Sequence, residues 1–222
     1  MRIGLYGGSF DPVHMGHLQI AEIACDQLRL DRIVFLPAAQ SPLKQGIVPE
    51  DPKLRIEMVR LAIGGNPRFF VDDREISRGG ISYTVDTLQE ITLQPVDKSD
   101  VTNQGQKNEW FLIIGADSLA DFPRWKSPEL ILKLATLAVV ARGGQPALDW
   151  SVLNNFLDPN ALARIKGNEI RMPQIEISSR DIRARVASGK SIRYLVHPAV
   201  GAFIEAKNLY SPAIKNTPNL LP

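Results

Sequence analysis

The sequence has little cysteine, little net charge and no long apolar run, and each shortage excludes a class of protein. Cys25 is the single cysteine among 222 residues, so the fold does not depend on an internal disulfide. The formal net charge of +2 provides no global field for binding nucleic acid or a membrane surface. No apolar stretch is long enough to span a bilayer, and the first residues lead into a strand-like run, unlike a signal peptide. We expect a cytoplasmic protein without nucleic-acid or membrane partners.

The hydrophobic pattern alternates between strands and helices along most of the chain. Strands are predicted at residues 3–6, 32–37, 68–72, 110–115, 136–141 and 174–177. Helices are predicted at residues 18–28, 53–63, 83–93, 128–134, 160–166, 181–187 and 198–207. Strand, crossover helix and strand in succession form the unit of a parallel sheet. The predicted fold class is a doubly wound α/β sheet, which binds ligands beyond the carboxyl ends of its strands.

A loop with two glycines and two histidines follows the first predicted strand. It reads Gly7-Gly8-Ser9-Phe10-Asp11-Pro12-Val13-His14-Met15-Gly16-His17. We expect Gly7 and Gly8 to let the backbone turn sharply and approach a ligand, with main-chain N–H groups directed at phosphate oxygens. A helix predicted to begin near residues 16–17 adds the positive end of its dipole. His14 and His17 can each donate a hydrogen bond to phosphate, more strongly when protonated. The loop predicts a nucleoside triphosphate site.

Other interpretations of this loop are weaker. A structural role for both histidines stays open as the alternative. A zinc site needs about four ligands, and besides carboxylates the chain offers only His14, His17, His197 and Cys25, so we predict no metal site built by the protein. The glycines begin neither a Walker motif nor a dinucleotide Gly-x-Gly-x-x-Gly motif. Cys25 lies in an apolar-periodic run and is expected to be a small buried side chain.

The loop resembles the His-x-Gly-His signature of the nucleotidyltransferase superfamily. Its longer form is typical of small-molecule adenylyl- and cytidylyltransferases. Residues 80–88, 111–125 and 177–183, followed by 196–198 and 208–210, resemble segments of bacterial nicotinate-mononucleotide adenylyltransferases in the same order. The resemblance implies a Rossmann-like domain at residues 1–177, a helical part at 178–210 that completes the ATP site, and a flexible tail at 211–222. It also implies an enzyme that joins nicotinate mononucleotide to the adenylyl group of ATP, giving deamido-NAD and pyrophosphate in the route to NAD.

The resemblance assigns the ATP half of this reaction to particular residues. The catalytic candidates are His14, His17, Lys44 and Arg183, which are expected to contact ATP phosphates. The ATP-binding candidates are Gly7, Gly8, Ser9, Phe10, Gly16, Ile177, Ser178 and Arg183. The nucleophile is a 5′-phosphate that is already anionic, so the reaction needs in-line positioning and charge neutralisation rather than a general base. We expect Mg²⁺ to arrive with ATP and to have few or no direct protein ligands.

The acceptor half rests on segments farther along the chain. The candidates for binding the mononucleotide are Tyr83, Thr84, Gly115, Asp117, Trp125 and Arg142. Trp125, in a loop-like stretch, is expected to stack on the pyridine ring, and Asp117 to bind a ribose hydroxyl. Tyr83 and Thr84, at a helix start, are expected to present N–H groups to the nicotinate carboxylate.

Three departures from the family pattern put the substrate preference in doubt. Leu43 stands where relatives often have histidine, Arg180 where they often have threonine, and Gly143 where they often have proline. Nicotinamide mononucleotide, phosphopantetheine or a CTP-dependent reaction remain alternatives within the same chemistry. A nucleotide-binding regulatory protein without activity is the alternative of another class. The sequence does not decide between a monomer and a homo-oligomer.

Overall fold

The computed structural model describes residues 1–42, 49–93 and 108–212, and a six-stranded parallel sheet forms its centre. The strand order is β3-β2-β1-β4-β5-β6, and each neighbouring pair is parallel. The strands are β1 (Arg2–Gly8), β2 (Arg32–Pro37), β3 (Phe69–Val71), β4 (Glu109–Gly115), β5 (Thr136–Arg142) and β6 (Ile170–Met172). The order reverses between β1 and β4, which confirms the doubly wound α/β prediction.

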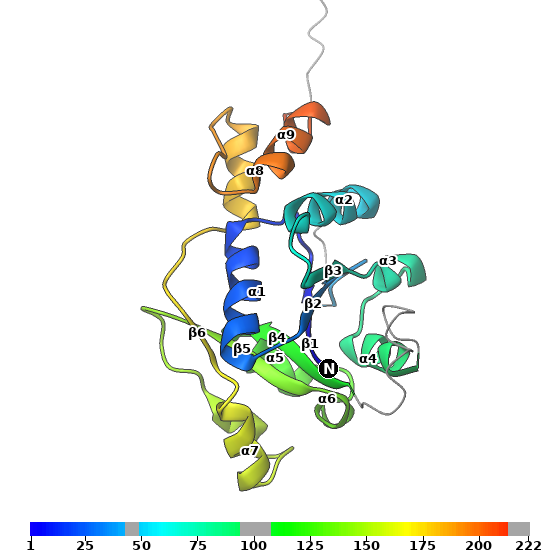
Figure 1. Cartoon of the computed structure of the whole chain (residues 1–222), viewed down its shortest axis with the longest axis vertical. Coiled ribbons are helices and arrows are strands. Elements are labelled where there is room, and N and C mark those ends of the chain that lie inside the picture. The colour runs from blue at the N-terminus through cyan, green and yellow to red at the C-terminus, as the bar shows by residue number, and fades with distance from the viewer. Residues whose placement is uncertain (43–48, 94–107, 213–222) are drawn as a thin grey trace, which may run out of the picture.

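Helices cover both faces of the sheet (Figure 1). The helices of the described residues are α1 (Met15–Leu28), α2 (Pro52–Ile63), α3 (Arg74–Arg78), α4 (Thr84–Leu93), α5 (Ala116–Asp121), α6 (Pro128–Leu134), α7 (Pro159–Lys166), α8 (Ser179–Ala187) and α9 (Pro198–Ala206), with 3₁₀ turns η2 (Phe122–Arg124) and η3 (Trp150–Leu153). None of the helices in these segments is long and apolar enough to cross a membrane.

Two hydrophobic clusters, one on each face, share the strands between them. In β2, Ile33 and Phe35 belong to the cluster that includes α1 and α2, whereas Val34 and Leu36 belong to the cluster that includes α4 and α6. Successive side chains of a strand point to opposite faces. A sheet covered on both faces therefore has strands that are apolar throughout, which explains the continuous apolar run in β4.

The C-terminal helices pack on the same core as α1. Ile182 of α8 and Val200 and Ile204 of α9 are buried in the cluster on the α1 face. Figure 1 shows α8 and α9 together at one end of the molecule, with α7 at the opposite end. The Tyr210 hydroxyl donates a 2.7 Å hydrogen bond to Asp11 Oδ1, which attaches the end of the helical part to the loop after β1.

Most predicted elements are confirmed, but the last strand is wrong. The sequence places it at residues 174–177, whereas β6 lies at Ile170–Met172 and pairs with Val140–Arg142 of β5. Ile175 and Ile177 are partly buried against the α1-side cluster without belonging to a strand. The alternation of apolar and polar residues at 174–177 therefore reflects packing of one side of this segment on that cluster. Helices α3 and α5 were not predicted, since five and six residues are too few to show a helical period.

Three further predictions concern a loop, the C-terminal tail and Cys25. The predicted polar loop at 95–108 and the predicted flexible tail at 211–222 lie almost wholly outside the described residues. Cys25 is buried in the cluster beside α1, as predicted, and burial raises the pKa of its thiol to about 11. The thiol is therefore protonated at neutral pH.

Candidate active site

Two cavities meet at the carboxyl ends of the strands, where the strand order reverses. The first has a volume of about 610 Å³ and contains both loop histidines in its wall. The second has a volume of about 310 Å³ and extends along the end of β4 to Trp125. Gly8 and Ser9 line both cavities, so the end of β1 lies where the two spaces meet. This is the position that a doubly wound sheet provides for a ligand.

The glycines of the loop do not make the predicted sharp turn. Gly7 and Gly8 are the last residues of β1 and pair with Leu36 and Pro37 of β2. The chain takes up its left-handed conformation at Phe10 instead, with a φ of 48°. Phe10 is only 1% exposed, and its ring packs against Gly8. The buried ring therefore holds the backbone of Phe10 in this conformation.

The surroundings of the two glycines differ. A Cβ on Gly8 would lie 3.0–3.2 Å from atoms of the Phe10 ring. A Cβ on Gly7 would meet no atom within 4 Å, and Gly7 lines the second cavity. Gly8 therefore makes room for the aromatic ring, and Gly7 leaves the backbone open to a ligand.

The two histidines are held together at the start of α1. The helix begins at Met15, somewhat earlier than predicted, and His14 is its N-cap residue. The two imidazole rings stack with centroids 3.7 Å apart and planes inclined by 26°. The His14 main-chain N–H donates to Nδ1 of His17 at 3.2 Å. A neutral His17 ring therefore carries its proton on Nε2.

His14 is a neutral residue at physiological pH. Its side chain lies in the wall of the first cavity although the residue is only 7% exposed. Burial first, and then the nearby charge of Arg142, lower the pKa of His14 to about 4. Without a bound ligand, the ring is therefore neutral at pH 7. Among the described residues, Nδ1 of His14 is buried and has no hydrogen-bond partner.

The start of α8 faces the histidines across the first cavity. Ser178 caps α8: its Oγ accepts the Asp181 N–H at 3.1 Å and donates to Asp181 Oδ2 at 2.7 Å. Nη1 of Arg183 donates to the Asp11 carbonyl at 2.5 Å and lies 3.5 Å from Asp11 Oδ2. Arg180, one of the departures from the family pattern, lines the same cavity.

The structure divides the predicted acceptor residues between the two cavities. The second cavity is lined by Tyr83, Thr84, Gly115 and Trp125. Asp117 and Arg142 line the first cavity with the histidines instead. Of the predicted ATP-binding residues, Gly8, Ser9, Phe10, Gly16, Ile177, Ser178 and Arg183 line the first cavity, and Gly7 the second.

Trp125 offers a donor that the described part of the chain does not use. It follows the 3₁₀ turn η2, so the stretch before it is more ordered than the predicted loop. Its ring lies 5.3 Å from that of Phe122, between centroids. Nε1 is buried and has no hydrogen-bond partner among the described residues. A buried N–H of this kind indicates a missing partner, and a ligand in the second cavity can supply one.

The catalytic candidate Lys44 and the departure at Leu43 lie outside the described residues. The part of the chain that the structure describes holds no group of three or more histidines, cysteines and carboxylates arranged for a metal ion. Asp11 and Asp117 are the carboxylates in the wall of the first cavity. Asp11 already accepts a hydrogen bond from Tyr210.

Two buried charged residues at this site had no signal in the sequence. Glu75 of α3 lines the second cavity, accepts a 2.8 Å hydrogen bond from Thr87 Oγ1, and has a pKa raised by burial. Arg55 of α2 is completely buried and donates to the Ser9 carbonyl. The helical pattern predicted at residues 53–63 assigns charged residues such as Arg55 to the solvent face, and no element was predicted around Glu75, so the sequence gave no reason to place either of them inside.

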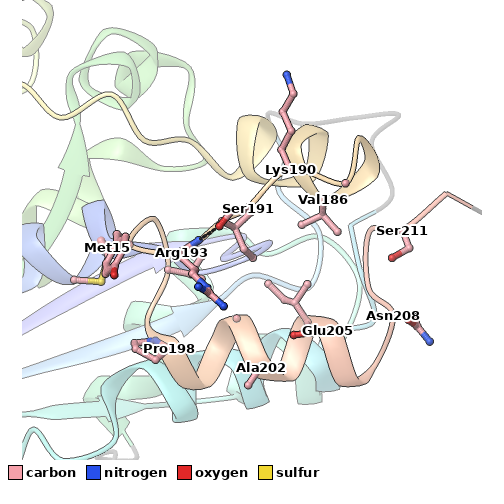
Figure 2. Close-up of a pocket in the computed structure, with 16 residues that line it drawn as sticks. Met15, Val186, Lys190, Ser191, Arg193, Pro198, Ala202, Glu205, Asn208 and Ser211 are labelled. Carbon is pink, nitrogen blue, oxygen red and sulfur yellow. Dashed lines mark hydrogen bonds between the residues drawn. The ribbon is translucent and has the colours of Figure 1, made fainter.

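A third cavity, of about 1080 Å³, lies between α8 and α9 (Figure 2). Val186, Lys190, Arg193 and Glu205 are among its lining residues. It is larger than the other two, but the site residues predicted from the sequence do not line it in the described chain. Its size alone does not make it the reaction site.

Comparison with known proteins identifies the family that the chain resembles. Residues 5–185 match the family described as cytidylyltransferase-like. A probable nicotinate-nucleotide adenylyltransferase of Rhodopirellula baltica is 45% identical over 208 residues, covering 94% of this chain and 92% of that protein. A probable nicotinate-nucleotide adenylyltransferase of Thermus thermophilus is 41% identical over 211 residues, covering 95% and 100%. A solved Plasmodium falciparum nicotinic acid mononucleotide adenylyltransferase complexed with NaAD shares the fold, with a TM-score of 0.69, 20% identity, and coverage of 94% and 97%.

Proposed function

The chain belongs to the nicotinate-nucleotide adenylyltransferase family, and we propose that its two adjoining cavities carry out the reaction for which that family is named. The reaction transfers the adenylyl group of ATP to the 5′-phosphate of nicotinate mononucleotide, giving deamido-NAD and pyrophosphate. The observation that carries the proposal is the meeting of the two cavities at Gly8 and Ser9. One cavity takes the triphosphate, the other takes the pyridine mononucleotide, and the reacting phosphates meet between them.

The first cavity has the donors that the triphosphate requires. His17, with its proton on Nε2, and neutral His14 face the α-phosphate, and the start of α8 with Ser178 and Arg183 holds the β- and γ-phosphates. As the bond to the leaving pyrophosphate breaks, negative charge grows on these oxygens, and fixed donors stabilise that charge. Lys44 is assigned to the same task from the sequence. A donor set without a base is sufficient, because the attacking phosphate is already ionised.

The second cavity binds the acceptor. The Trp125 ring stacks on the pyridine, and the N–H groups of Tyr83 and Thr84, at the start of α4, bind the nicotinate carboxylate. The ten-residue helix α4 adds its positive dipole end, which favours an anionic group over a neutral amide. Asp117 and Arg142 lie in the wall of the first cavity, so we assign them to groups nearer the reacting phosphates than to the pyridine.

Mg²⁺ enters this scheme as part of the ATP substrate. Mg²⁺ usually keeps several waters and binds through substrate phosphates with one or two carboxylates. The first cavity fits that pattern, since it presents the carboxylate of Asp117 beside cationic and neutral donors. The ion would neutralise phosphate charge, while the chain's own residues orient the two substrates.

We place this reaction in the cytoplasm, without nucleic-acid partners, on the grounds of composition and net charge.

The decisive experiment measures pyrophosphate release from ATP and Mg²⁺ with each candidate acceptor. We expect release with nicotinate mononucleotide and a kcat/KM well above that for nicotinamide mononucleotide. Equal values for the two would refute the preference for the acid and leave the chemistry intact. Absence of release from ATP, and from CTP in its place, with every mononucleotide and with phosphopantetheine would refute the enzyme and favour the regulatory alternative.

A further inference from the structure

Arg55 is buried below the site, out of reach of either substrate. Its exposed fraction is 0%, and the residues that line the two cavities do not include it. Burying a guanidinium is unfavourable unless its N–H groups find acceptors. Its hydrogen-bond partners in the described residues are main-chain carbonyl groups. The nearby carboxylates of Asp11 and Asp51 favour its charge, but its hydrogen bonds within the described chain all go to the main chain, and that arrangement requires an explanation beyond surface solubility.

The three carbonyl groups come from three separate segments around the site. Nε donates to Glu50 at 3.0 Å, just before α2. Nη1 donates to Ser9 at 2.6 Å, in the loop after β1, and Nη2 donates to Ala38 at 2.8 Å, just after β2. The planar, forked guanidinium reaches all three acceptors from one position. One side chain therefore fixes the ends of two neighbouring strands relative to each other.

The hydrogen bond from Arg55 to the Ser9 carbonyl orients the backbone of the loop after β1. The peptide between Ser9 and Phe10 is trans, so its N–H points opposite to its carbonyl. With the Ser9 carbonyl directed at Arg55, the Phe10 N–H points away from Arg55. Ser9 and Phe10 both line the first cavity. Arg55 thus determines which face of this peptide is available at the triphosphate site.

The hydrogen bond from Arg55 to the Ala38 carbonyl acts in the same way on the acceptor side. The Ala38 carbonyl is directed at Arg55, so the N–H of the same trans peptide, which belongs to Ala39, points the opposite way. That N–H donates to Ser82 Oγ at 2.9 Å. Ser82 lines the second cavity and directly precedes Tyr83, one of the proposed carboxylate-binding residues. The Ser82 N–H in turn donates to the Gln40 carbonyl at 2.9 Å.

We propose that Arg55 is a positioning residue that couples the two substrate sites, by fixing the Ser9–Phe10 peptide for ATP and the Ala38–Ala39 peptide for the mononucleotide. The inference rests on the proposed function for the identity of the two substrates. Under this inference Arg55 differs from residues that serve one substrate alone. Loss of the Arg55 guanidinium impairs both substrate sites together, although Arg55 touches neither substrate.

The test compares Arg55→Met, Arg55→Lys and Ser82→Ala with the control Met58→Ala. Met58 lies on the same helix, is completely buried and belongs to the hydrophobic cluster, so its truncation destabilises α2 without touching a site carbonyl. Steady-state constants for both substrates are measured at a temperature where circular dichroism shows every variant folded. Lysine retains the charge but lacks the fork that spans three carbonyls, so Arg55→Lys carries the test if Arg55→Met does not fold.

We expect both Arg55 variants to lower kcat/KM by about 10²-fold for ATP and for the mononucleotide alike, the scale on which a small misplacement of reacting groups acts. Ser82→Ala should raise the KM for the mononucleotide and leave the KM for ATP unchanged. Met58→Ala should keep both constants while its melting temperature falls. Wild-type constants in a folded Arg55 variant, or a loss confined to one substrate, would overturn the inference.

Binding of a non-hydrolysable ATP analogue by calorimetry separates this inference from the proposed function. The analogue needs no acceptor and no turnover. If the wild-type chain releases no pyrophosphate but binds the analogue, and Arg55→Lys weakens that binding tenfold or more, the proposed reaction fails and the positioning of the ATP loop by Arg55 stands. Equal affinities in the two proteins refute it.

Discussion

The buried His14 imidazole makes the stability of the folded chain depend on pH in a defined direction. Burial and the charge of Arg142 lower its pKa from 6.5 to about 4 in the folded state. Above pH 6.5 the ring is neutral in both the folded and the unfolded chain. Between pH 6.5 and 4 the unfolded chain binds a proton that the folded chain does not, so the free energy of unfolding decreases as the pH falls. The decrease from this one group reaches roughly 2.5 kcal/mol by pH 4.5, at 1.36 kcal/mol per pH unit.

Urea unfolding at pH 7.5 and pH 4.5, followed by circular dichroism, measures this contribution. His14→Asn removes the titrating ring and keeps a side chain that is favoured at a helix N-cap. We expect the wild-type chain to lose about 2.5 kcal/mol more than this variant between the two pH values. His197→Asn, at the N-cap of α9, is the matched control for removing a histidine from such a position. Equal losses in the wild-type and His14→Asn chains would show that burial does not suppress protonation of His14.

Four further predictions test the loop and the acceptor cavity. His17→Ala should lower kcat for pyrophosphate release by about 10²-fold, the scale of losing one donor at a developing charge, and an unchanged rate excludes that role. Gly8→Ala should reduce the free energy of unfolding by roughly 1–3 kcal/mol, because the new methyl group meets the Phe10 ring. Gly7→Ala should leave the urea midpoint unchanged, because the new methyl group meets no protein atom, and should raise the KM for the mononucleotide, because Gly7 lines the second cavity. Equal urea midpoints for Gly7→Ala and Gly8→Ala would contradict the expected difference in stability. Trp125→Ala should raise the KM for the mononucleotide by about tenfold and leave that for ATP unchanged, whereas equal increases in both argue against stacking.

The sheet could be predicted because its strands are buried on both faces. In β4 and β5 this produces continuous apolar runs, which the pattern identifies to within a residue at each end. The failure at the sheet edge has the same physical origin. β6 is a three-residue strand with Arg171 exposed between two buried residues, so its apolar content is low. Residues 174–177 have the better pattern and no place in the sheet.

The candidate site was predictable where it is local in sequence. The loop from Gly7 to His17 contains its own glycines, histidines and helix start, so one stretch of sequence indicates much of the wall of the first cavity. Features that depend on packing were not predictable. The left-handed turn falls on Phe10, which a propensity argument would assign to glycine, because the buried ring determines the backbone there. Arg55 reads as one more polar residue of an amphipathic helix until the carbonyl groups around it are known.

The departures from the family pattern show how tertiary context decides the effect of a substitution. Gly143 stands where relatives often have proline, and its N–H donates to the Met172 carbonyl at 2.9 Å, which extends the pairing of β5 with the short strand β6. Proline has no N–H and cannot make this bond. A Cβ at this position would also lie 3.3 Å from the main-chain nitrogen of Gln174. The Gly143 hydrogen bond therefore ties the end of β6 to β5 just before segment 173–177, which leads to Ile177 and Ser178 in the wall of the first cavity. A change that looks like a looser turn in the sequence thus takes part in the pairing at the edge of the sheet.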